Sequence, residues 1–407
     1  MTPIEIRADG RTARQSWSWL PEERIEADAL AQIRNIGALP VSVAVAVMPD
    51  AHVGYGMPIG TVLATDNAVV PYAVGVDIGC GMVALKTDLR VAEHRERVAD
   101  ALHEIYRRVP VGQPSKQDRG QGSHATRQDS AVLREWLDER GAYIADSKQI
   151  RERADRQLGT LGGGNHFIEV QSDGEWLWLM FHTGSRSFGK QLCDVHHDAA
   201  VAWCARYHTV LPDKELAFLA FDVDAGREYF ADMRYAMRYA EESRGRIERA
   251  CLAAMTETFG AFTATERIET HHNFASVEKH FGREVVVHRK GAVRTTDDRG
   301  EGVLVTIPGS MQTGSYIGRG KHNVLSLDTC SHGAGRRLGR NAVRREHAGV
   351  DIAAEMKGEG IILVCPPGSD ALDEAGRAYK DIEEVMSLQS DLVEPVVKLS
   401  PLGVVKG

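Results

Sequence analysis

Short runs of β-branched and small apolar residues, separated by glycine-rich turns, fill residues 41–85 and constrain the fold most strongly. The runs are VSVAVAVM (41–48), GTVLAT (60–65) and AVVPYAVGV (68–76). Runs of this length, bounded by turn residues, are typical of buried β-strands. Strand-like runs return later in the chain, as EVVVH (284–288) and GVLVTI (302–307). The sequence therefore predicts buried sheet in both halves of the chain.

Helical patterns separate these strand-rich regions. Residues 21–36 begin with Pro21 and carry acidic residues in the first turn, which favours a helix start. Residues 91–107 have a helical pattern as well. Apolar residues at helical spacing over 227–259 predict one long helix or two, with the methionine and aromatic stripe in the core. The polar stretch 110–130 predicts a loop or a mobile lid.

Length and composition exclude several classes of protein. The 407 residues, 43% of them hydrophobic, suffice for a large core. No clear linker divides the chain, so we expect a single α+β domain over residues 1–407. No apolar run reaches about 18 residues, and the N-terminal segment lacks a signal-peptide core, so we expect a cytoplasmic protein without a membrane span. Six cysteines with no CxxC pair argue against a disulfide framework or a zinc ribbon.

The charge balance argues against binding of nucleic acid through the overall charge of the protein. The net charge is −8, from 49 basic and 57 acidic side chains. An RNA partner would therefore have to meet a local basic patch. The candidates are Arg289 with Lys290, and the run Arg336, Arg337, Arg340, Arg344 and Arg345. Such runs are equally often solvated faces of a protein.

Aspartate, cysteine and histidine gather in turns rich in glycine or asparagine, where backbone can approach a ligand closely. Asp77 and Cys80 lie three residues apart in GVDIGCGM. The other turns carry Asn165, His166 and Glu169 in LGTLGGGNHFIEV, His182 and Arg186 in HTGSRSFG, and His271, His272 and Asn273 in THHNF. A single histidine is more often a core or surface residue than a ligand. Three histidines together with a carboxylate and a thiolate indicate a metal centre.

Two further glycine-rich segments suit phosphate chemistry. IPGSMQTGSY (307–316) offers Ser310 and Ser315 beside backbone N–H groups, but it lacks the lysine arrangement of a P-loop. In CSHGAGRRLGR (330–340), His332 precedes a Gly-Ala-Gly turn and Arg336. An imidazole can attack phosphorus, and a nearby arginine can hold the developing charge. Residue-level reasoning expects Lys406, the second-last residue of the sequence, to be frayed and inert.

In this order the strings PDAHVGYGMPIG, GVDIGCGM, LGTLGGGNHFIEV, HTGSRSFG, HHN, RKGA, PGSM and HGAGR resemble the RtcB family of RNA ligases. The C-terminal AYKDIEEVM, QSDLVEPV and VKG match as well, and the likeness runs from about residue 40 to 407. It is closest to the shorter bacterial branch. The combination of GVDIGCGM with HGAGR in one chain is highly specific. The resemblance implies a large α+β body of mixed and antiparallel sheets flanked by helices, with the metal and nucleotide site in a central cleft.

The resemblance also implies a ligand set, because two Mn²⁺ ions share a cysteine in that family. Carried over by motif, Cys80 bridges the two ions. His182 and His272 complete the protein ligands of one ion, and Asp77 and His166 complete those of the other.

His332 corresponds to the family's guanylylated nucleophile, the implied catalytic residue. The implied nucleotide-binding residues are Asn165, His166, Phe167, Ile168, Glu169, His272, Asn273, Pro308, Gly309, Ser310, Met311, Ser315, His332, Gly333, Ala334, Gly335, Tyr379 and Lys406. Tyr379 would stack near the guanine, and Lys406 gains a role that residue-level reasoning denies it.

The implied reaction joins an RNA 3′-phosphate or 2′,3′-cyclic phosphate end to a 5′-hydroxyl end, in tRNA splicing or RNA repair, with GTP and two Mn²⁺ ions. His332 takes GMP from GTP, and the GMP then passes to the RNA 3′-phosphate before the 5′-hydroxyl attacks. Arg186, Arg289, Lys290 and Arg336 would hold RNA phosphates. The need for an activating partner protein stays open.

Some positions depart from the family's usual strings. They are Thr183 and Ser187 in HTGSRS, Ser243 before Arg244, Gln312 after PGSM, and Gly339-Arg340 after HGAGR. None removes an implied metal ligand or the nucleophile, but they favour a specialised repair paralogue over a splicing enzyme. Two alternatives stay open: a binuclear-metal cyclic phosphodiesterase, which would not need His332, and a non-catalytic RNA-end-binding paralogue.

Overall fold

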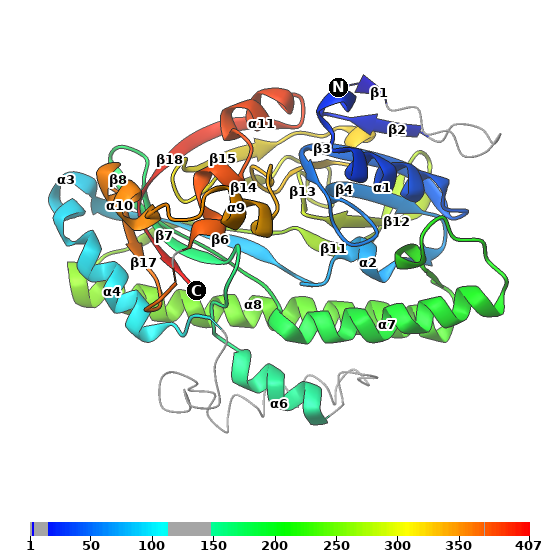
Figure 1. Ribbon diagram of the computed structural model, residues 1–407, viewed down its shortest axis with the longest axis horizontal. Helices are drawn as coiled ribbons and strands as arrows, with labels where there is room; N and C mark the ends of the chain where they lie inside the picture. Colours follow the sequence, from blue (N-terminus) through cyan, green and yellow to red (C-terminus); the bar gives the residue numbers. More distant parts are fainter. Residues whose placement is uncertain (1, 4–14, 113–147, 370) are drawn as a thin grey trace.

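The computed structural model describes residues 2–3, 15–112, 148–369 and 371–407. Its helices and strands form the α+β architecture that the sequence predicts, with two large, largely antiparallel sheets (Figure 1). The assignment of residues 1–407 to one domain stays a prediction. Among the described helices, none combines the length and apolarity needed to cross a membrane.

The first sheet has six strands, and four of them belong to two hairpins from distant parts of the chain. In spatial order its strands are β1 (Thr2–Pro3), β2 (Gln15–Ser18), β3 (Ser42–His52), β4 (Ile59–Thr65), β12 (Arg283–Lys290) and β11 (Asn273–His280). Along β3 the side chains alternate between two cores. Val45 and Val47 face the helices, whereas Ala44 and Ala46 face the smaller strands and α11.

The second sheet has eight strands and carries most of the candidate site. Its order is β10 (Ala264–His271), β6 (Gly81–Arg90), β8 (Trp176–Thr183), β7 (Phe167–Ser172), β18 (Val393–Lys406), β15 (Ser315–Gly320) and β14 (Leu304–Pro308), with β17 (Ile362–Val364) paired to β18. Two small ladders pair β13 (Ala292–Arg294) with β16 (Thr329–Ser331) and β5 (Ala68–Val69) with β9 (Leu219–Ala220).

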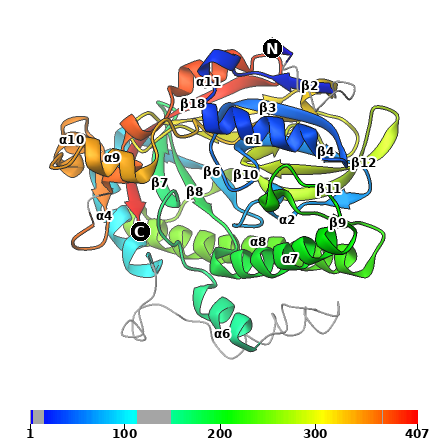
Figure 2. The same ribbon diagram turned by 45° about the vertical axis from the view of Figure 1, so that its right-hand side comes forward.

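Helices cover the sheets and connect them. They are α1 (Ala27–Ala38), α2 (Pro71–Val74), α3 (Val91–His94), α4 (Val98–Arg108), α6 (Lys148–Gln157), α7 (Arg186–Arg206), α8 (Asp224–Phe259), α9 (Arg340–Glu346), α10 (Ile352–Gly358) and α11 (Ile382–Leu388). Short 3₁₀ turns span Glu22–Arg24, Arg95–Arg97, Lys214–Leu216, Val324–Ser326, Leu372–Glu374 and Gly376–Ala378. Helix α8 runs along one side of the molecule, and together with α4 it packs on the face of the eight-stranded sheet that carries Val83 and Leu85 (Figures 1 and 2).

Four expectations from the sequence need comment. The pattern over 227–259 forms one helix, and its apolar stripe is buried as predicted. The helix expected to begin at Pro21 instead begins at Ala27, because residues 22–24 form a separate 3₁₀ turn. The run 68–76 is only partly strand: Pro71 has no N–H for a sheet ladder and begins the short helix α2. Most of the loop expected over 110–130 lies outside the described residues.

Candidate active site

The register of the eight-stranded sheet places five chemically active residues at one edge. In β6, Met82 pairs with His182 of β8, and His182 in turn pairs with Phe167 of β7. Phe167 pairs with Lys406 of β18. On the other side of β6, Gly81 pairs with His271 of β10. The strand ends that carry Cys80, His166, His182, His272 and Lys406 therefore lie next to one another, although they come from distant parts of the sequence.

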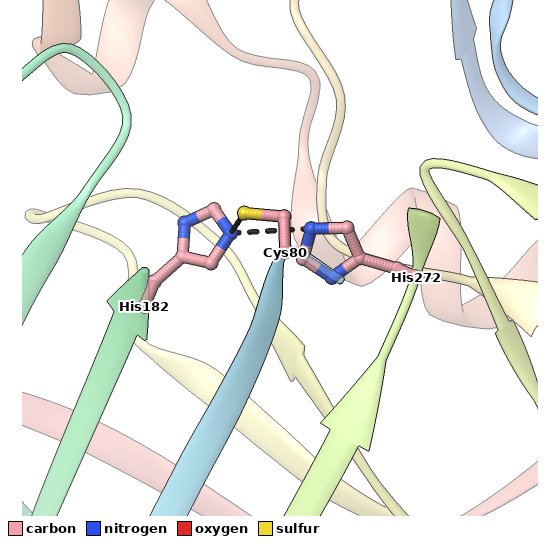
Figure 3. A group of neighbouring side chains, drawn as sticks. All are labelled: Cys80, His182 and His272. Carbon is pink, nitrogen blue, oxygen red and sulfur yellow. Dashed lines mark hydrogen bonds between the residues drawn. The ribbon is translucent and has the colours of Figure 1, made fainter. Parts of the chain in front are cut away.

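Four of these residues, all except Lys406, form two ligand groups together with Asp77, and the two groups share one sulfur atom. Cys80, His182 and His272 make one group, and Asp77, Cys80 and His166 make the other. Within each group all ligand atoms lie within 4.8 Å of one another. Figure 3 shows Cys80, His182 and His272 converging from neighbouring strand ends. The structure thus brings together the five residues that the sequence analysis names, in the two sets that the resemblance implies.

Hydrogen bonds fix which ring nitrogens face the centre. His166 Nδ1 lies 2.9 Å from Leu161 O and His182 Nδ1 lies 3.0 Å from Asn165 O. Only an N–H can bond a carbonyl, so the His182 ring carries its proton on Nδ1 and presents the Nε2 lone pair inward. The His166 Nδ1 atom also lies 2.9 Å from Arg186 Nη1, and its Nε2 faces the Asp77 carboxylate. His182 Nε2 lies 3.1 Å from Cys80 Sγ. Electron-rich atoms at this separation suit a cation between them, and the thiolate, imidazole and carboxylate set fits a transition-metal ion.

Burial opposes charge on three members of this cluster: His182, His272 and Cys80. Burial lowers the pKa of His182 and His272 well below the ordinary value, and neighbouring histidines lower it further. Burial also raises the pKa of the Cys80 thiol well above its ordinary value, and the Asp77 carboxylate raises it further. His182 and His272 are therefore neutral at neutral pH. A bound cation would reverse the preference of the thiol, because metal coordination deprotonates cysteine.

The carboxylate of Asp77 is held by the start of helix α7. Arg186, the first residue of that helix, has a left-handed φ of 61°. This conformation is costly for a non-glycine residue and is typical of functional sites. It directs the Arg186 N–H to Asp77 Oδ1 at 3.0 Å, and Ser185 Oγ lies 3.3 Å from the same oxygen. The Asp77 carboxylate is thereby aimed at His166, whose Nε2 lies 3.1 Å away.

His332 lies beside this cluster and is oriented by a buried carboxylate. Asp50 Oδ2 lies 2.6 Å from His332 Nδ1, and it also accepts the backbone N–H groups of His332 (3.1 Å) and Gly333 (3.3 Å). The ring therefore carries its proton on Nδ1 and keeps an Nε2 lone pair. Its centroid lies 5.0 Å from that of His272. Gly291 makes room for the ring, because a Cβ there would lie 3.0 Å from His332 Cε1.

Asp50 is a functional residue that the sequence analysis did not single out. It stands in PDAHVGYGMPIG, one of the strings that carry the resemblance, and it is fully buried near the end of β3. A carboxylate in an otherwise apolar strand could have drawn attention to Asp50, because a buried carboxylate needs a hydrogen-bonding or charged partner. The partner could not be read from the sequence.

A cavity of about 770 Å³ extends from the ligand cluster past His332. Of the nucleotide-binding residues implied by the resemblance, it is lined by Asn165, Phe167, Glu169, His272, Asn273, Pro308, Gly309, Ser310, Met311, Ser315, His332, Gly333, Ala334, Gly335, Tyr379 and Lys406. His166 lies behind them in the ligand cluster. The volume is in the range of small-molecule and cofactor sites.

Ile168 is a correction to that set. Alternate residues of a strand point to opposite faces, so Phe167 and Glu169 face the cavity while Ile168 faces the other side of β7. Its side chain is fully buried in the core beneath α4 and α8. The Ile168 side chain is therefore not part of the cavity wall.

Lys406 and Glu169 are buried ionisable residues in the lining of the cavity. Lys406 Nζ donates to Gly164 O at 2.6 Å and lies 3.9 Å from Glu374 Oε2. Burial raises the pKa of Glu169 to about 7, although a hydrogen bond from Gln171 and the charge of Lys406 offset part of the effect. Lys406 is thus buried at the end of a strand, contrary to the expectation of a frayed residue.

Comparisons with known proteins identify the family of this chain. A family model described as tRNA-splicing ligase RtcB matches residues 32–407. The chain belongs to the RtcB family. It is 35% identical to the RNA-splicing ligase RtcB of Escherichia coli strain K12 over 96% of both chains. It is 31% identical to the tRNA-splicing ligase RtcB of Methanococcus maripaludis, over 95% of this chain and 92% of that one. The RNA-splicing ligase RtcB of Mycobacterium bovis is 33% identical over 92% of this chain and 100% of its own.

The basic residues of this RtcB chain are mostly paired with acids rather than free for RNA. Arg289 was expected to hold phosphate, but it is fully buried and bonded to Glu278, so that expectation is wrong. Lys290 is also buried, with its ammonium on two backbone carbonyls. In the later run, the acid-paired arginines are Arg336 with Glu374, Arg340 and Arg344 with Asp373, and Arg345 with Glu346. Arg337 is exposed, lines the cavity, and has no carboxylate partner among the described residues.

Arg244 of α8 is the second residue with a role that the sequence analysis did not assign. Its fully buried guanidinium donates to the carbonyls of Gly79 (2.8 Å) and Thr183 (3.1 Å) and lies 3.0 Å from His271 Nδ1. These three residues adjoin Cys80, His182 and His272 in the chain. Arg244 also bonds Glu269 at 2.7 Å, which pairs its charge. One arginine therefore ties together the three strand ends that carry the first ligand group.

Among the departures from the usual RtcB strings, Gln312 has an evident structural role. Its amide nitrogen lies 3.1 Å from the Glu359 carboxylate, and its Oε1 accepts the backbone N–H of Gly376 at 2.8 Å. The side chain thus ties the loop after β14 to the segment that leads to Tyr379. Ser243 accepts the backbone N–H of Gly159 at 3.0 Å.

Proposed function

We propose that this protein is an RNA ligase that joins RNA 3′-phosphate or 2′,3′-cyclic phosphate ends to 5′-hydroxyl ends, using GTP and two Mn²⁺ ions, in RNA repair or tRNA splicing. The observation that carries the proposal is the position of His332. Its ring is held by Asp50 through Nδ1, and it lies against His272 of the ligand cluster in a nucleotide-sized cavity. Names of relatives at up to 35% identity, all RNA-splicing or tRNA-splicing ligases, support the same reaction.

The donor set supports two manganese ions that share the Cys80 thiolate. His182 and His272 would complete the protein ligands of one ion, and Asp77 and His166 those of the other. Thiolate and imidazole ligands favour Mn²⁺ over Mg²⁺. When bound, the ions would neutralise phosphate oxygens and orient the attacking and leaving groups.

The chain's own residues account for nucleotide transfer. His332 Nε2 forms a P–N bond to the α-phosphorus of GTP, and the bond to pyrophosphate breaks. Asp50 stabilises the positive charge that develops on the ring, because its carboxylate accepts a hydrogen bond from the Nδ1–H group. Lys406 and Glu169, which both line the cavity, would bind the nucleotide.

The later steps require RNA in the same cavity. The 3′-phosphate attacks the GMP phosphorus, which breaks the P–N bond and releases His332. A 5′-hydroxyl then attacks the activated 3′-phosphorus, and GMP leaves with the P–O bond electrons. A cyclic phosphate end is first opened by water. Arg337 and Arg186, at the cavity and at the ligand cluster, would contact RNA phosphates.

The decisive experiment is incubation with labelled GTP and Mn²⁺, followed by detection of protein-bound GMP. His332→Ala should abolish labelling and GTP-dependent ligation, yet it should still join an RNA whose 3′ end is already guanylylated. His322→Ala is the matched control, because His322 also pairs with an aspartate, at 2.7 Å, but its side chain is 59% exposed and outside the cavity. If the wild-type protein opens cyclic phosphates but forms no GMP adduct, it is a phosphodiesterase. If it neither opens cyclic phosphates nor forms the adduct, it is a non-catalytic RNA-end-binding paralogue.

A further inference from the structure

The loop between β3 and β4 exposes an aromatic ring at the rim of the cavity. Tyr55 is 63% exposed and Val53 is 39% exposed. Both line the cavity, and no other large hydrophobic residue that is exposed in the described parts of the chain does so. The Tyr55 hydroxyl has no hydrogen-bond partner, and its ring stacks on no other ring, among the described residues. Its side chain therefore contributes little to the protein's own packing.

The backbone beneath Tyr55 is held firmly on several sides. The Gln32 amide bonds both the N–H and the C=O of Gly54, at 3.2 and 2.5 Å. The buried ammonium of Lys290 donates to Tyr55 O at 2.5 Å. Gly56 has a left-handed φ of 65° and packs against Glu215, where a Cβ would lie 2.9 Å from the Glu215 side chain. An aromatic side chain on such a fixed backbone loses little conformational freedom when a ligand covers it.

The same contacts place this loop near the reacting groups. Lys290, which holds the Tyr55 carbonyl, is followed by Gly291, which lies against the His332 ring. Ile59, at the end of the loop, contacts Gly291 as well. The end of β12, at Lys290 and Gly291, thus lies between the backbone of Tyr55 and the ring of His332. A group that stacks on Tyr55 would lie at the mouth of the cavity in which RNA ends react.

We propose that Tyr55 is a stacking platform for the unpaired nucleobase at one of the RNA ends to be joined. The inference rests on the proposed function and adds a residue that binds RNA without contacting GTP. Proteins that hold single-stranded RNA without reading its sequence commonly stack bases on aromatic side chains, because every base has a π face. A net charge of −8 makes such an uncharged contact valuable, since bulk electrostatics cannot supply the affinity.

The test compares Tyr55→Ala and Tyr55→Phe with Tyr207→Ala, a tyrosine that is 55% exposed and outside the cavity. The KM for RNA in ligation and the Kd of each RNA strand without GTP, by fluorescence anisotropy, are measured. Tyr55→Ala should raise both by about 5- to 150-fold, the range of one base–aromatic stack. Tyr55→Phe should keep near-normal values, because the ring stacks and the hydroxyl is unused. Tyr207→Ala should match the wild type.

Abasic RNA identifies the base and guards against a folding artefact. Removing the terminal base from the strand that Tyr55 contacts should weaken wild-type binding and abolish the difference between wild type and Tyr55→Ala. Separate abasic 3′-phosphate and 5′-hydroxyl strands show which end is bound. GMP labelling of His332, which needs no RNA, reports on the fold and on the proposed function independently. Values for Tyr55→Ala within twofold of wild type, equal losses in Tyr55→Phe, or an undiminished difference with both abasic strands would overturn the inference.

Discussion

Replacing Asp50 by asparagine tests how His332 is activated. One oxygen of Asp50 accepts three N–H groups: the His332 ring at 2.6 Å, the His332 backbone at 3.1 Å and the Gly333 backbone at 3.3 Å. The asparagine amide could place either its oxygen or its NH₂ group at that point. Backbone N–H groups cannot bond an NH₂ group, so the reversed amide would leave two donors unpaired at about 1–3 kcal/mol each. The amide oxygen should therefore occupy the position, and the His332 ring should keep its proton on Nδ1.

The loss should then reflect charge alone. A hydrogen bond to a charged group contributes about 1.5–3 kcal/mol and a neutral one about 0.5–1.5 kcal/mol. The difference of about 1–2 kcal/mol predicts a guanylylation rate about 5- to 30-fold lower. In serine proteases the equivalent substitution costs about 10⁴-fold, because there the histidine adopts the wrong tautomer.

The assay is single-turnover labelling by GTP at saturating Mn²⁺. Asp298→Asn is the matched control, because the Asp298 side chain is 95% exposed. A loss above about 10³-fold in Asp50→Asn would show that the backbone donors do not hold the amide. A loss below twofold would show that the carboxylate does not assist His332.

Three further outcomes are expected. Cys80→Ser should lower the bound Mn²⁺, measured by elemental analysis, and should slow ligation about 100-fold or more because serine resists deprotonation; Cys251→Ser, also buried, should change neither. Arg244→Lys should weaken Mn²⁺ affinity about 10- to 100-fold in a titration, because one ammonium cannot replace a forked guanidinium; Arg267→Lys, on the exposed side of the same ion-pair network, should not. Burial raises the pKa of Glu169 from 4.5 to about 7, so the folded state binds more protons than the unfolded state in that window. The contribution of Glu169 to stability against urea should therefore fall as pH rises from about 4.5 to about 7, whereas buried histidines such as His182 and His272 contribute the opposite slope. The stability of wild type relative to Glu169→Gln should decrease over that window, and a difference that does not change with pH would contradict the assignment.

Much of the fold could be predicted from local patterns. The strands β3 and β4 and the helix α8 follow from apolar periodicity, because a segment that buries one or both faces must carry that burial in its own sequence. The error at Pro71 has the opposite cause. There the apolar pattern is compatible with a strand, and the missing N–H of one residue decides against it.

The ligand residues were also accessible to sequence reasoning. Asp77, Cys80, His166, His182 and His272 are chemically distinctive side chains in turns, and the resemblance sorted them into two sets. What the sequence could not supply is their alignment, which depends on the register of β10, β6, β8 and β7. Register is a property of paired strands, and no single strand contains it.

The tertiary structure alone decided the roles of the buried charges. Asp50 meets His332 across 282 positions of the chain, and Arg244 meets Gly79 across 165. For Arg289 the sequence suggests a cation available to RNA. In the folded chain it is paired with Glu278 on the neighbouring strand. The sequence shows which side chains can carry a charge, but it does not show whether they are buried or which residues they contact. A buried charge requires a specific opposite charge or a set of hydrogen bonds, and only the folded chain brings those groups within reach.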